Sequence, residues 1–155
     1  MLKQWMRGVG AAVVVASFVA GALAQEQRGT RDEAIAMTKA AFEHIKKVGA
    51  EQAYKDFTYD KANWTKKDLY VMVYDGKGIA LAHGANDKLV GRDMSAIKDA
   101  NGKSVITGLI EAANKGGGWF DYDWPHPQTK KIEAKATYAI KPPSGDGFVG
   151  VGIYR

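Results

Sequence analysis

The 155-residue sequence contains no cysteine. Disulfide bonds, thiolate metal sites and a cysteine nucleophile are therefore excluded. A hydrophobic core must hold the fold together without cross-links, and the 46% hydrophobic composition permits one. Long basic runs are also missing, because the formal charge of +5 is scattered and no cluster exceeds two adjacent basic residues. We therefore expect no nucleic-acid partner.

Common catalytic motifs are missing as well. The sequence has no G-x-S-x-G, H-E-x-x-H or G-x-x-x-x-G-K pattern. The three histidines, His44, His83 and His126, lie far apart and lack metal-ligand spacing. We expect no cofactor, no bound metal, and a protein that binds a ligand instead of catalysing a reaction.

No apolar run reaches the roughly 20 residues that a membrane span needs. The apolar stretch Gly8 to Ala20 follows Lys3 and Arg7 and precedes an Ala-Leu-Ala triplet. This order predicts a secretory signal peptide over residues 1–24. An uncleaved anchor is the alternative, and the shortness of the stretch disfavours it. We expect residues 25–155 to form one periplasmic or secreted domain without membrane insertion.

Helical signals come first along this domain. Thr30 and Glu33 form a capping box, and apolar residues follow at helical spacing until Gly49. A shorter helix is predicted over Glu51 to Phe57, and residues 58–68 are polar without a clear period.

Strand signals dominate the rest. The segments rich in β-branched and aromatic residues are 69–74, 79–83, 119–124, 131–140 and 148–154. The first two flank a glycine-containing turn, and a helix is predicted from Val105 to Lys115 after a loop-like stretch, 84–103. We expect an α+β domain with a five-stranded antiparallel sheet, a long N-terminal helix and a helical crossover.

Asp121 and Asp123 are the best catalytic candidates. Strand alternation puts both carboxylates on one face, roughly 7 Å apart. That separation suits a paired-acid glycosidase. The opposite face of the strand is aromatic, however, so the carboxylates are expected on the solvated side.

The aromatic side of this strand carries an unusual neighbour. If the turn centres on residues 127–130, the cross-strand pairs are Phe120 with Thr137, Tyr122 with Lys135, and Trp124 with Glu133. A lysine among aromatic rings requires an anion, because an unpaired ammonium in a dry site is costly. Either Glu133, with Lys135 reaching to the rim, or a bound carboxylate supplies that anion, and the residues alone leave both open.

Several segments together resemble the single Cache domain, an extracytoplasmic sensor of bacterial chemoreceptors and histidine kinases. They are LYVMVYDGKGIALAHG from Leu69, LVGRD from Leu89, KDANGK from Lys98, YDWP from Tyr122, KATY from Lys135 and GVGIY from Gly150. With the long N-terminal helix, the resemblance covers about residues 30–154.

The resemblance implies a PAS-like sheet with a pocket for a small organic acid such as acetate, propionate, lactate or pyruvate. It assigns the carboxylate to Lys135 and Tyr122, and the aliphatic end to Phe120 and Trp124. His83 and Tyr70 are further candidate ligand-binding residues. Tyr138, on the opposite face, is a weaker one.

Sensors of this family signal through a transmembrane helix after the last strand, whereas this sequence ends at Arg155. We therefore expect a stand-alone domain that binds a small carboxylate and reports to a membrane-bound receptor or kinase. A small exported hydrolase using Asp121 and Asp123, or a ligand-free interaction module, are the alternatives.

Overall fold

The computed structural model describes residues 27–143 and 145–155, so the predicted signal peptide lies outside the described residues. The helices are α2 (Arg31–Val48), α3 (Ala50–Tyr59), α4 (Lys61–Trp64), the 3-10 turn η1 (Asp87–Leu89) and α5 (Val105–Asn114). None of the helices in this described part is long and apolar enough to cross a membrane.

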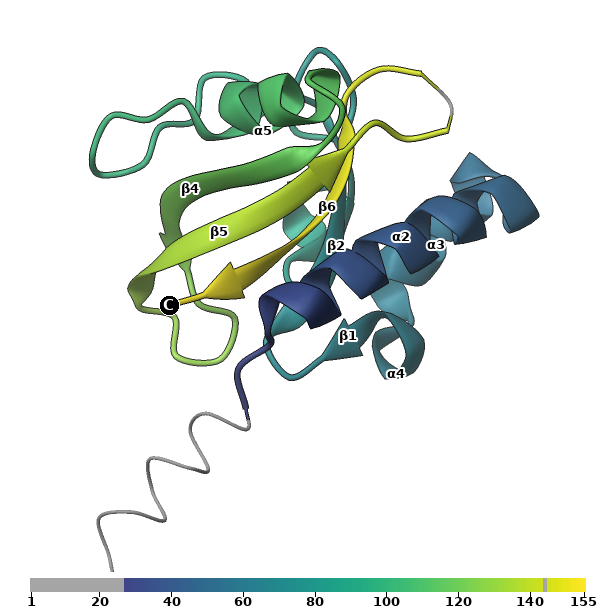
Figure 1. Cartoon of the computed structure of the whole chain (residues 1–155), viewed down its shortest axis with the longest axis horizontal. Helices are drawn as coiled ribbons and strands as arrows, with labels where there is room; N and C mark the ends of the chain where they lie inside the picture. Colours follow the sequence, from purple (N-terminus) through teal and green to yellow (C-terminus); the bar gives the residue numbers. More distant parts are fainter. Residues whose placement is uncertain (1–26, 144) are drawn as a thin grey trace, which may run out of the picture.

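One antiparallel sheet forms the centre of the domain (Figure 1). Its strands are β1 (Thr65–Lys66), β2 (Leu69–Tyr74), β3 (Ala80–His83), β4 (Gly118–Pro125), β5 (Ile132–Ile140) and β6 (Phe148–Tyr154). The order is β1-β2-β6-β5-β4, and β3 pairs with the second half of β2. The predicted α+β class and its five strands are confirmed, and the two-residue strand β1 is added to them.

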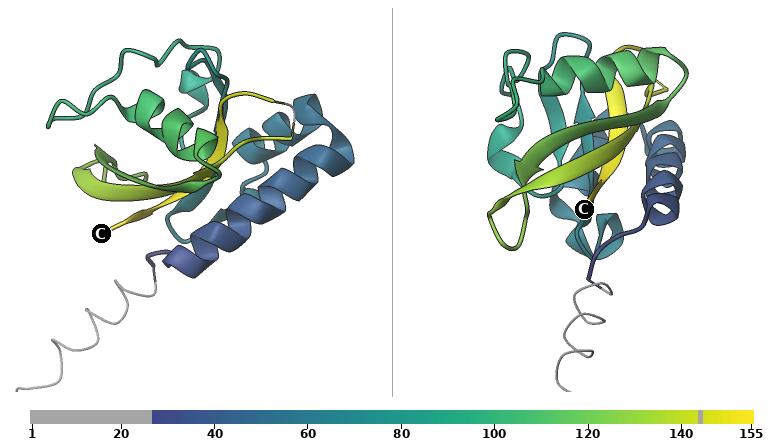
Figure 2. Two further views of the ribbon diagram at one scale, coloured as in Figure 1. Left: turned by 45° about the horizontal axis from the view of Figure 1, so that its top comes forward. Right: turned by 60° about the vertical axis from the view of Figure 1, so that its left-hand side comes forward.

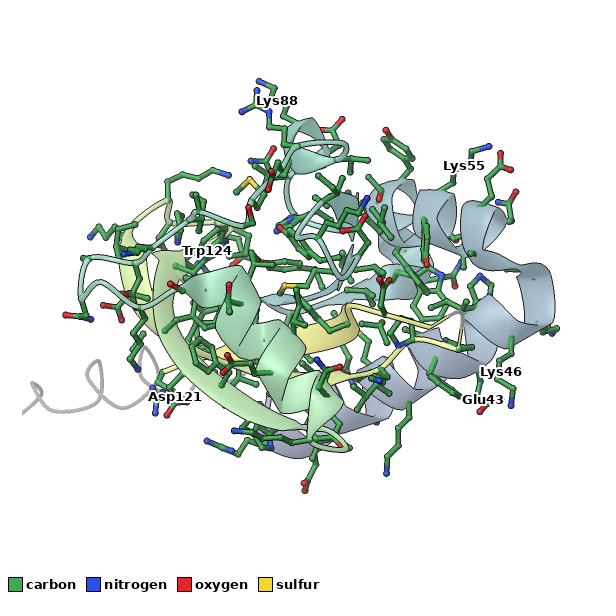
Figure 3. The ribbon with its side chains drawn as sticks, turned by 90° about the horizontal axis from the view of Figure 1, so that it is seen from above. Glu43, Lys46, Lys55, Lys88, Asp121 and Trp124 are labelled. Carbon is green, nitrogen blue, oxygen red and sulfur yellow. The ribbon has the colours of Figure 1, made fainter. Side chains whose placement is uncertain are left out.

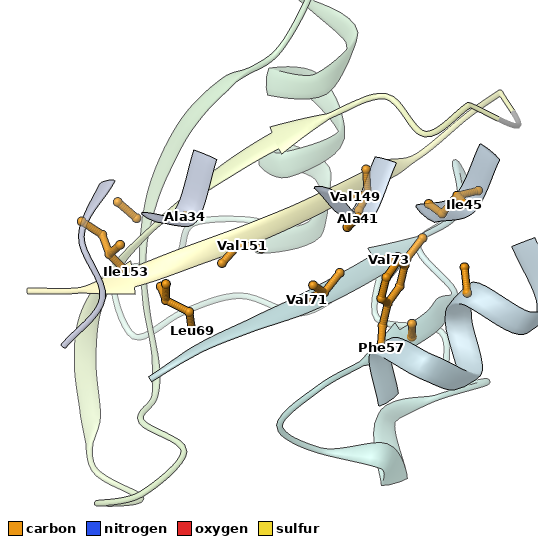
Figure 4. Close-up of a cluster of buried hydrophobic side chains, with 13 residues drawn as sticks. Ala34, Ala41, Ile45, Phe57, Leu69, Val71, Val73, Val149, Val151 and Ile153 are labelled. Atoms are coloured by element: carbon orange, nitrogen blue, oxygen red, sulfur yellow. The ribbon is translucent and has the colours of Figure 1, made fainter. Parts of the chain in front are cut away.

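Helices cover both faces of the sheet (Figure 2). On one face α2 and α3 pack on alternate residues of β2 and β6, including Leu69, Val71, Val149 and Val151 (Figure 4). On the other face α5 packs against the intervening residues, including Tyr74 and Phe148. Because β2 is buried on both sides, its sequence is continuously hydrophobic instead of alternating.

The segment 58–68 is more regular than its sequence predicts. Asp60 caps α4 by accepting a hydrogen bond from the Asn63 backbone N–H at 3.3 Å. A helix of four residues is too short to show an apolar period, which explains why the sequence pattern missed it. β1 follows directly and pairs with the start of β2.

The predicted capping box at the start of α2 is confirmed. The Thr30 hydroxyl accepts from the Glu33 backbone N–H at 3.2 Å, and the Thr30 N–H donates to the Glu33 carboxylate at 2.9 Å. Lys66 and Lys67 also contact this carboxylate, at 3.1 and 3.0 Å. Glu33 therefore ties the helix start to the turn before β2.

Glu33 should make the stability of the domain depend on acidic pH. The Thr30 backbone N–H, and after it the two lysines, lower the pKa of Glu33 from 4.5 to about 2. A depressed carboxyl pKa contributes stability that is fully present above 4.5 and is lost as the pH falls toward 2. Denaturant unfolding between pH 2 and 7 should show a steeper acid loss for the wild type than for Glu33→Gln. Parallel curves for the two proteins would contradict this assignment.

Candidate ligand-binding site

A cavity of about 630 Å³ lies on the α5 face of the sheet, between the loop after β3 and the β4–β5 turn. Figure 3 looks down on this side, with Trp124 labelled on β4 and Lys88 on the loop. The wall includes Tyr70, His83 and Trp124 from the sheet and His126 from the β4–β5 turn. The loop adds the apolar side chains Leu89, Met94 and Ile97. Charged side chains also line the cavity, among them the exposed lysines Lys88, Lys98 and Lys130 and the acids Asp99 and Asp123. The loop thus contributes both apolar and charged side chains, and the sheet side contributes aromatic and hydrogen-bonding groups.

Lys135 on β5 lies directly behind this wall and is fully buried. Its Nζ donates to the Tyr70 hydroxyl at 2.6 Å, and Tyr70 lines the cavity. The same nitrogen lies 4.3, 5.0 and 5.9 Å from the ring centroids of Tyr70, Tyr154 and Tyr122. Among residues 27–143 and 145–155, no carboxylate oxygen lies within 4 Å of it. Lys135 is therefore a buried amine among aromatic rings without an ion-pair partner, and the alternative in which it reaches the rim is wrong.

Burial determines the protonation of this group and its neighbours. It lowers the pKa of Lys135 well below its ordinary value, and the charge of Asp68 opposes that effect. Burial likewise raises the pKa of Tyr70 and of Tyr122 well above 10. Both tyrosines therefore keep their hydroxyl protons.

These hydroxyls form a chain of hydrogen bonds along the sheet. The Tyr154 hydroxyl donates to the Pro125 carbonyl at 2.9 Å, which uses its single proton. Tyr70, whose oxygen is 3.2 Å from that of Tyr154, therefore donates to it. Lys135 in turn donates to Tyr70. The chain links the buried amine to Pro125, another residue of the cavity wall.

His83 on β3 is a neutral donor in the same wall. Its Nδ1 accepts from the backbone N–H groups of Asn86 at 3.0 Å and Ala85 at 3.3 Å, so its proton is on Nε2. Burial, and after it the charge of Lys135, lowers the pKa of His83 to about 3. The ring lies 5.0 Å from that of Tyr70. His83 and Tyr70 are thus neighbouring neutral hydrogen-bonding groups.

Glu133 is not the partner of Lys135. It pairs with Arg28 at 3.0 Å, and its second oxygen lies 3.8 Å from His126 Nε2. His126 Nε2 lies 3.3 Å from one oxygen of the buried Asp68 carboxylate. The other Asp68 oxygen accepts a hydrogen bond from the Gly29 N–H at 2.7 Å. Glu133, one of the two anions that the sequence offered for Lys135, is therefore engaged by other residues.

The structure separates the six predicted site residues into three groups. Tyr70, His83 and Trp124 line the cavity. Lys135 and Tyr122 lie behind the wall, and the Tyr122 hydroxyl bonds the Thr137 hydroxyl at 2.8 Å. Phe120 does not line the cavity but packs closely against Gly108 of α5.

The predicted opposite face of β5 is confirmed for Tyr138. Its ring packs 5.5 Å from that of Trp119, a side chain that contacts the core beneath α2 and α3. Tyr138 is therefore directed away from Lys135 and the cavity.

The two candidate catalytic acids have different partners. Asp121 is exposed and lies 3.7 Å from Arg155. Asp123 lines the cavity, accepts from the Asn101 side chain at 2.8 Å, and donates its backbone N–H to Asp99 at 3.1 Å. The contacts of Asp123 fasten the loop to the edge strand β4. Within the described part of the chain, no group of three or more metal-ligating side chains gathers in one place.

Three site residues escaped the sequence analysis: Asp68, His126 and Tyr154. The predicted β4–β5 register is confirmed, with Tyr122 opposite Lys135. β6 places Tyr154 opposite the other side of Lys135. The sequence analysis used a turn to set the register only between β4 and β5, so the position of Tyr154 on β6 was not predicted.

A model of the family described as single Cache domain 2 matches residues 3–155. The chain belongs to this family. Among solved structures, a methyl-accepting chemotaxis protein from Vibrio parahaemolyticus is 30% identical, with a TM-score of 0.71 over 80% of this chain and 87% of that one. A periplasmic sensor domain of a chemotaxis protein is 25% identical, with a TM-score of 0.62 over 90% and 99% of the two chains.

Two curated relatives match the Cache domain over 88 residues each. The sensor histidine kinase MctS of Rhizobium johnstonii is 33% identical over 57% of this chain. The methyl-accepting chemotaxis protein McpP of Pseudomonas putida is 31% identical over 56% of it. The matched part spans only 19% and 16% of those proteins. The shared region is thus a sensor domain within much longer chains.

A glycine makes room for the buried lysine of this Cache domain. A Cβ added to Gly152 of β6 would lie 2.4 Å from Lys135 Cε and 2.3 Å from the Thr137 hydroxyl oxygen. Gly152→Ala should therefore destabilise the domain by about 1–3 kcal/mol through overpacking. Gly118→Ala is the matched control, since no atom lies within 4 Å of its added Cβ. Equal midpoints for both variants in denaturant unfolding would show that the Lys135 side chain can move aside at little cost, and would contradict the prediction.

Proposed function

We propose that this Cache domain is a ligand-binding sensor for a small organic acid. The observation that carries the proposal is the buried amine of Lys135, which lacks a carboxylate partner among the described residues and donates to a cavity-wall tyrosine. Since Glu133 does not reach Lys135, a carboxylate bound in the cavity is the remaining anion of the two that the sequence offered.

The wall offers the contacts that such an acid requires. Tyr70 and His83 present neutral polar groups, and Lys135 behind Tyr70 adds positive charge when protonated. Hydrogen bonds to an ionised acceptor are stronger than those between neutral groups, and a low-dielectric site strengthens them further. Leu89, Met94 and Trp124 are suited to cover the aliphatic part of the molecule.

A related structure supports the ligand class. A Cache chemosensory domain described for carboxylic acid recognition has a TM-score of 0.65 to this chain at 22% identity, over 89% of this chain and 98% of that one. At this identity the likeness concerns the fold, so the acid-binding assignment here depends on Lys135 and the wall.

The proposal includes a location and a partner. The predicted signal peptide, residues 1–24, would deliver residues 25–155 to the periplasm or the exterior. A sensor kinase and a chemotaxis protein carry the matching domain, so a membrane-bound receptor or kinase is the proposed recipient of the signal.

A thermal-shift screen tests the function directly. Acetate, propionate, pyruvate, L-lactate and longer monocarboxylates should be compared with amino acids at millimolar concentration. A ligand at one hundred times its Kd adds about 2.7 kcal/mol to the free energy of unfolding. A flat screen would instead favour an interaction module without a ligand.

Removal of the buried charge should weaken binding without harming the fold. Lys135→Met keeps most of the stem, and we expect affinity for the best acid to fall by about 2 kcal/mol or more, roughly thirtyfold. The ligand-free variant should be equally or more stable, because a buried amine without an ion pair is replaced by an apolar group.

Lys39→Met is the matched control, since Lys39 is exposed on α2 and does not line the cavity. Calorimetry should show nearly wild-type affinity for it. If Lys135→Met binds as the wild type does, the carboxylate lies elsewhere.

A further inference from the structure

We propose that an acid enters this cavity together with one proton, because Lys135 is a neutral amine in the empty domain and an ammonium beside the bound carboxylate. The inference rests on the proposed function and adds its regulation by pH. It follows from what surrounds the amine when no acid is present.

An ammonium at this position has too few partners. It carries three N–H donors, and the hydrogen bond to Tyr70 at 2.6 Å is the one formed within the described residues. The three tyrosine rings offset part of the lost hydration through cation–π contacts. Because the amine is completely buried and no carboxylate of the described residues lies within 4 Å, most of the lost hydration of an ammonium is not compensated.

The titratable groups that face Lys135 do not supply the missing charge. Tyr70, Tyr122 and Tyr154 come from β2, β4 and β6, and burial raises the pKa of each above its ordinary value. His83 from β3 is neutral because burial lowers its pKa.

Asp68 is the acid whose charge acts on Lys135. Its two oxygens are engaged by the Gly29 N–H and by His126, at 2.7 and 3.3 Å. A neutral amine fits these surroundings, and the lowered pKa of Lys135 agrees with it.

A carboxylate changes this balance. Its negative charge beside Tyr70 and His83 favours the ammonium, since an opposite charge within about 4–6 Å raises the pKa of an amine. The amine then takes a proton from solvent, so the anion and the proton bind together. The domain therefore responds to the concentration of the undissociated acid, and its apparent association constant should fall by up to tenfold per pH unit above the pKa of free Lys135.

The charge state can be tested without any ligand. Between the folded and the unfolded pKa of Lys135, the unfolded chain binds one more proton than the folded one. The ratio of the unfolding constants of wild type and Lys135→Met should then fall by up to tenfold per pH unit as the pH rises within that interval. Measurements from pH 6 to 9, with Lys39→Met as control, detect this change. A constant ratio would mean that Lys135 is protonated in the folded domain and would overturn the inference.

A direct titration covers the possibility that Lys135→Met does not fold. The ¹³Cε resonance of Lys135 in selectively labelled wild-type protein should titrate far below 10.5, the ordinary lysine value. A midpoint at or above 10 would refute the neutral amine.

Calorimetry with acetate, propionate, pyruvate and L-lactate completes the test. At a pH above the midpoint that the titration gives for free Lys135, binding enthalpies in phosphate and in Tris should differ by the difference between the buffer ionisation enthalpies times a proton uptake approaching one. Lys39→Met should take up the same number of protons. Binding without proton uptake would overturn this inference and leave the proposed function intact. If no acid binds at all, the proposed function fails, and the inference of coupled binding fails with it.

Discussion

The burial of the Lys135 amine in the middle of an antiparallel sheet constrains most of what surrounds it. Its stem passes over β6 at Gly152, where any side chain would collide with it. Its nitrogen ends among three tyrosines from three different strands. Aromatic rings accept a nearby cation and also pack well when the amine is neutral, so the site tolerates both protonation states. The core at this point is therefore built around a group whose charge depends on its neighbours.

The cavity beside that amine has two walls of different character. The sheet side is rigid, because β2 and β6 are buried on both faces, pair with each other, and pair further with β3 and β5. The loop side has little regular structure and is held to β4 by side chains, with Asp99, Asn101 and Lys103 contacting the edge strand. A rigid scaffold that positions a less regular loop is a common arrangement for a binding site.

Polar contacts connect the cavity to the beginning of α2. His126 lines the cavity and touches Asp68, and Asp68 accepts from the backbone of Gly29, immediately before the capping box. Glu133 and Arg28 form a second connection nearby. The hydrogen bonds of a buried carboxylate are costly to break, so the helix start and the cavity wall share one polar network.

Local sequence signals were sufficient for the helix starting at Arg31, for five of the strands and for the β4–β5 register, because a capping box and a short turn act between residues close in the chain. They were also sufficient to place Lys135 opposite Tyr122. The depth of Lys135, the contributions of Tyr154, Asp68 and His126, and the separation of Phe120 from the cavity were decided by tertiary structure alone. These features depend on the pairing of β6 with β5 and β2, and on the contacts between the 84–104 segment and β4. Such contacts join residues far apart in sequence, and no short-range pattern specifies which of them form.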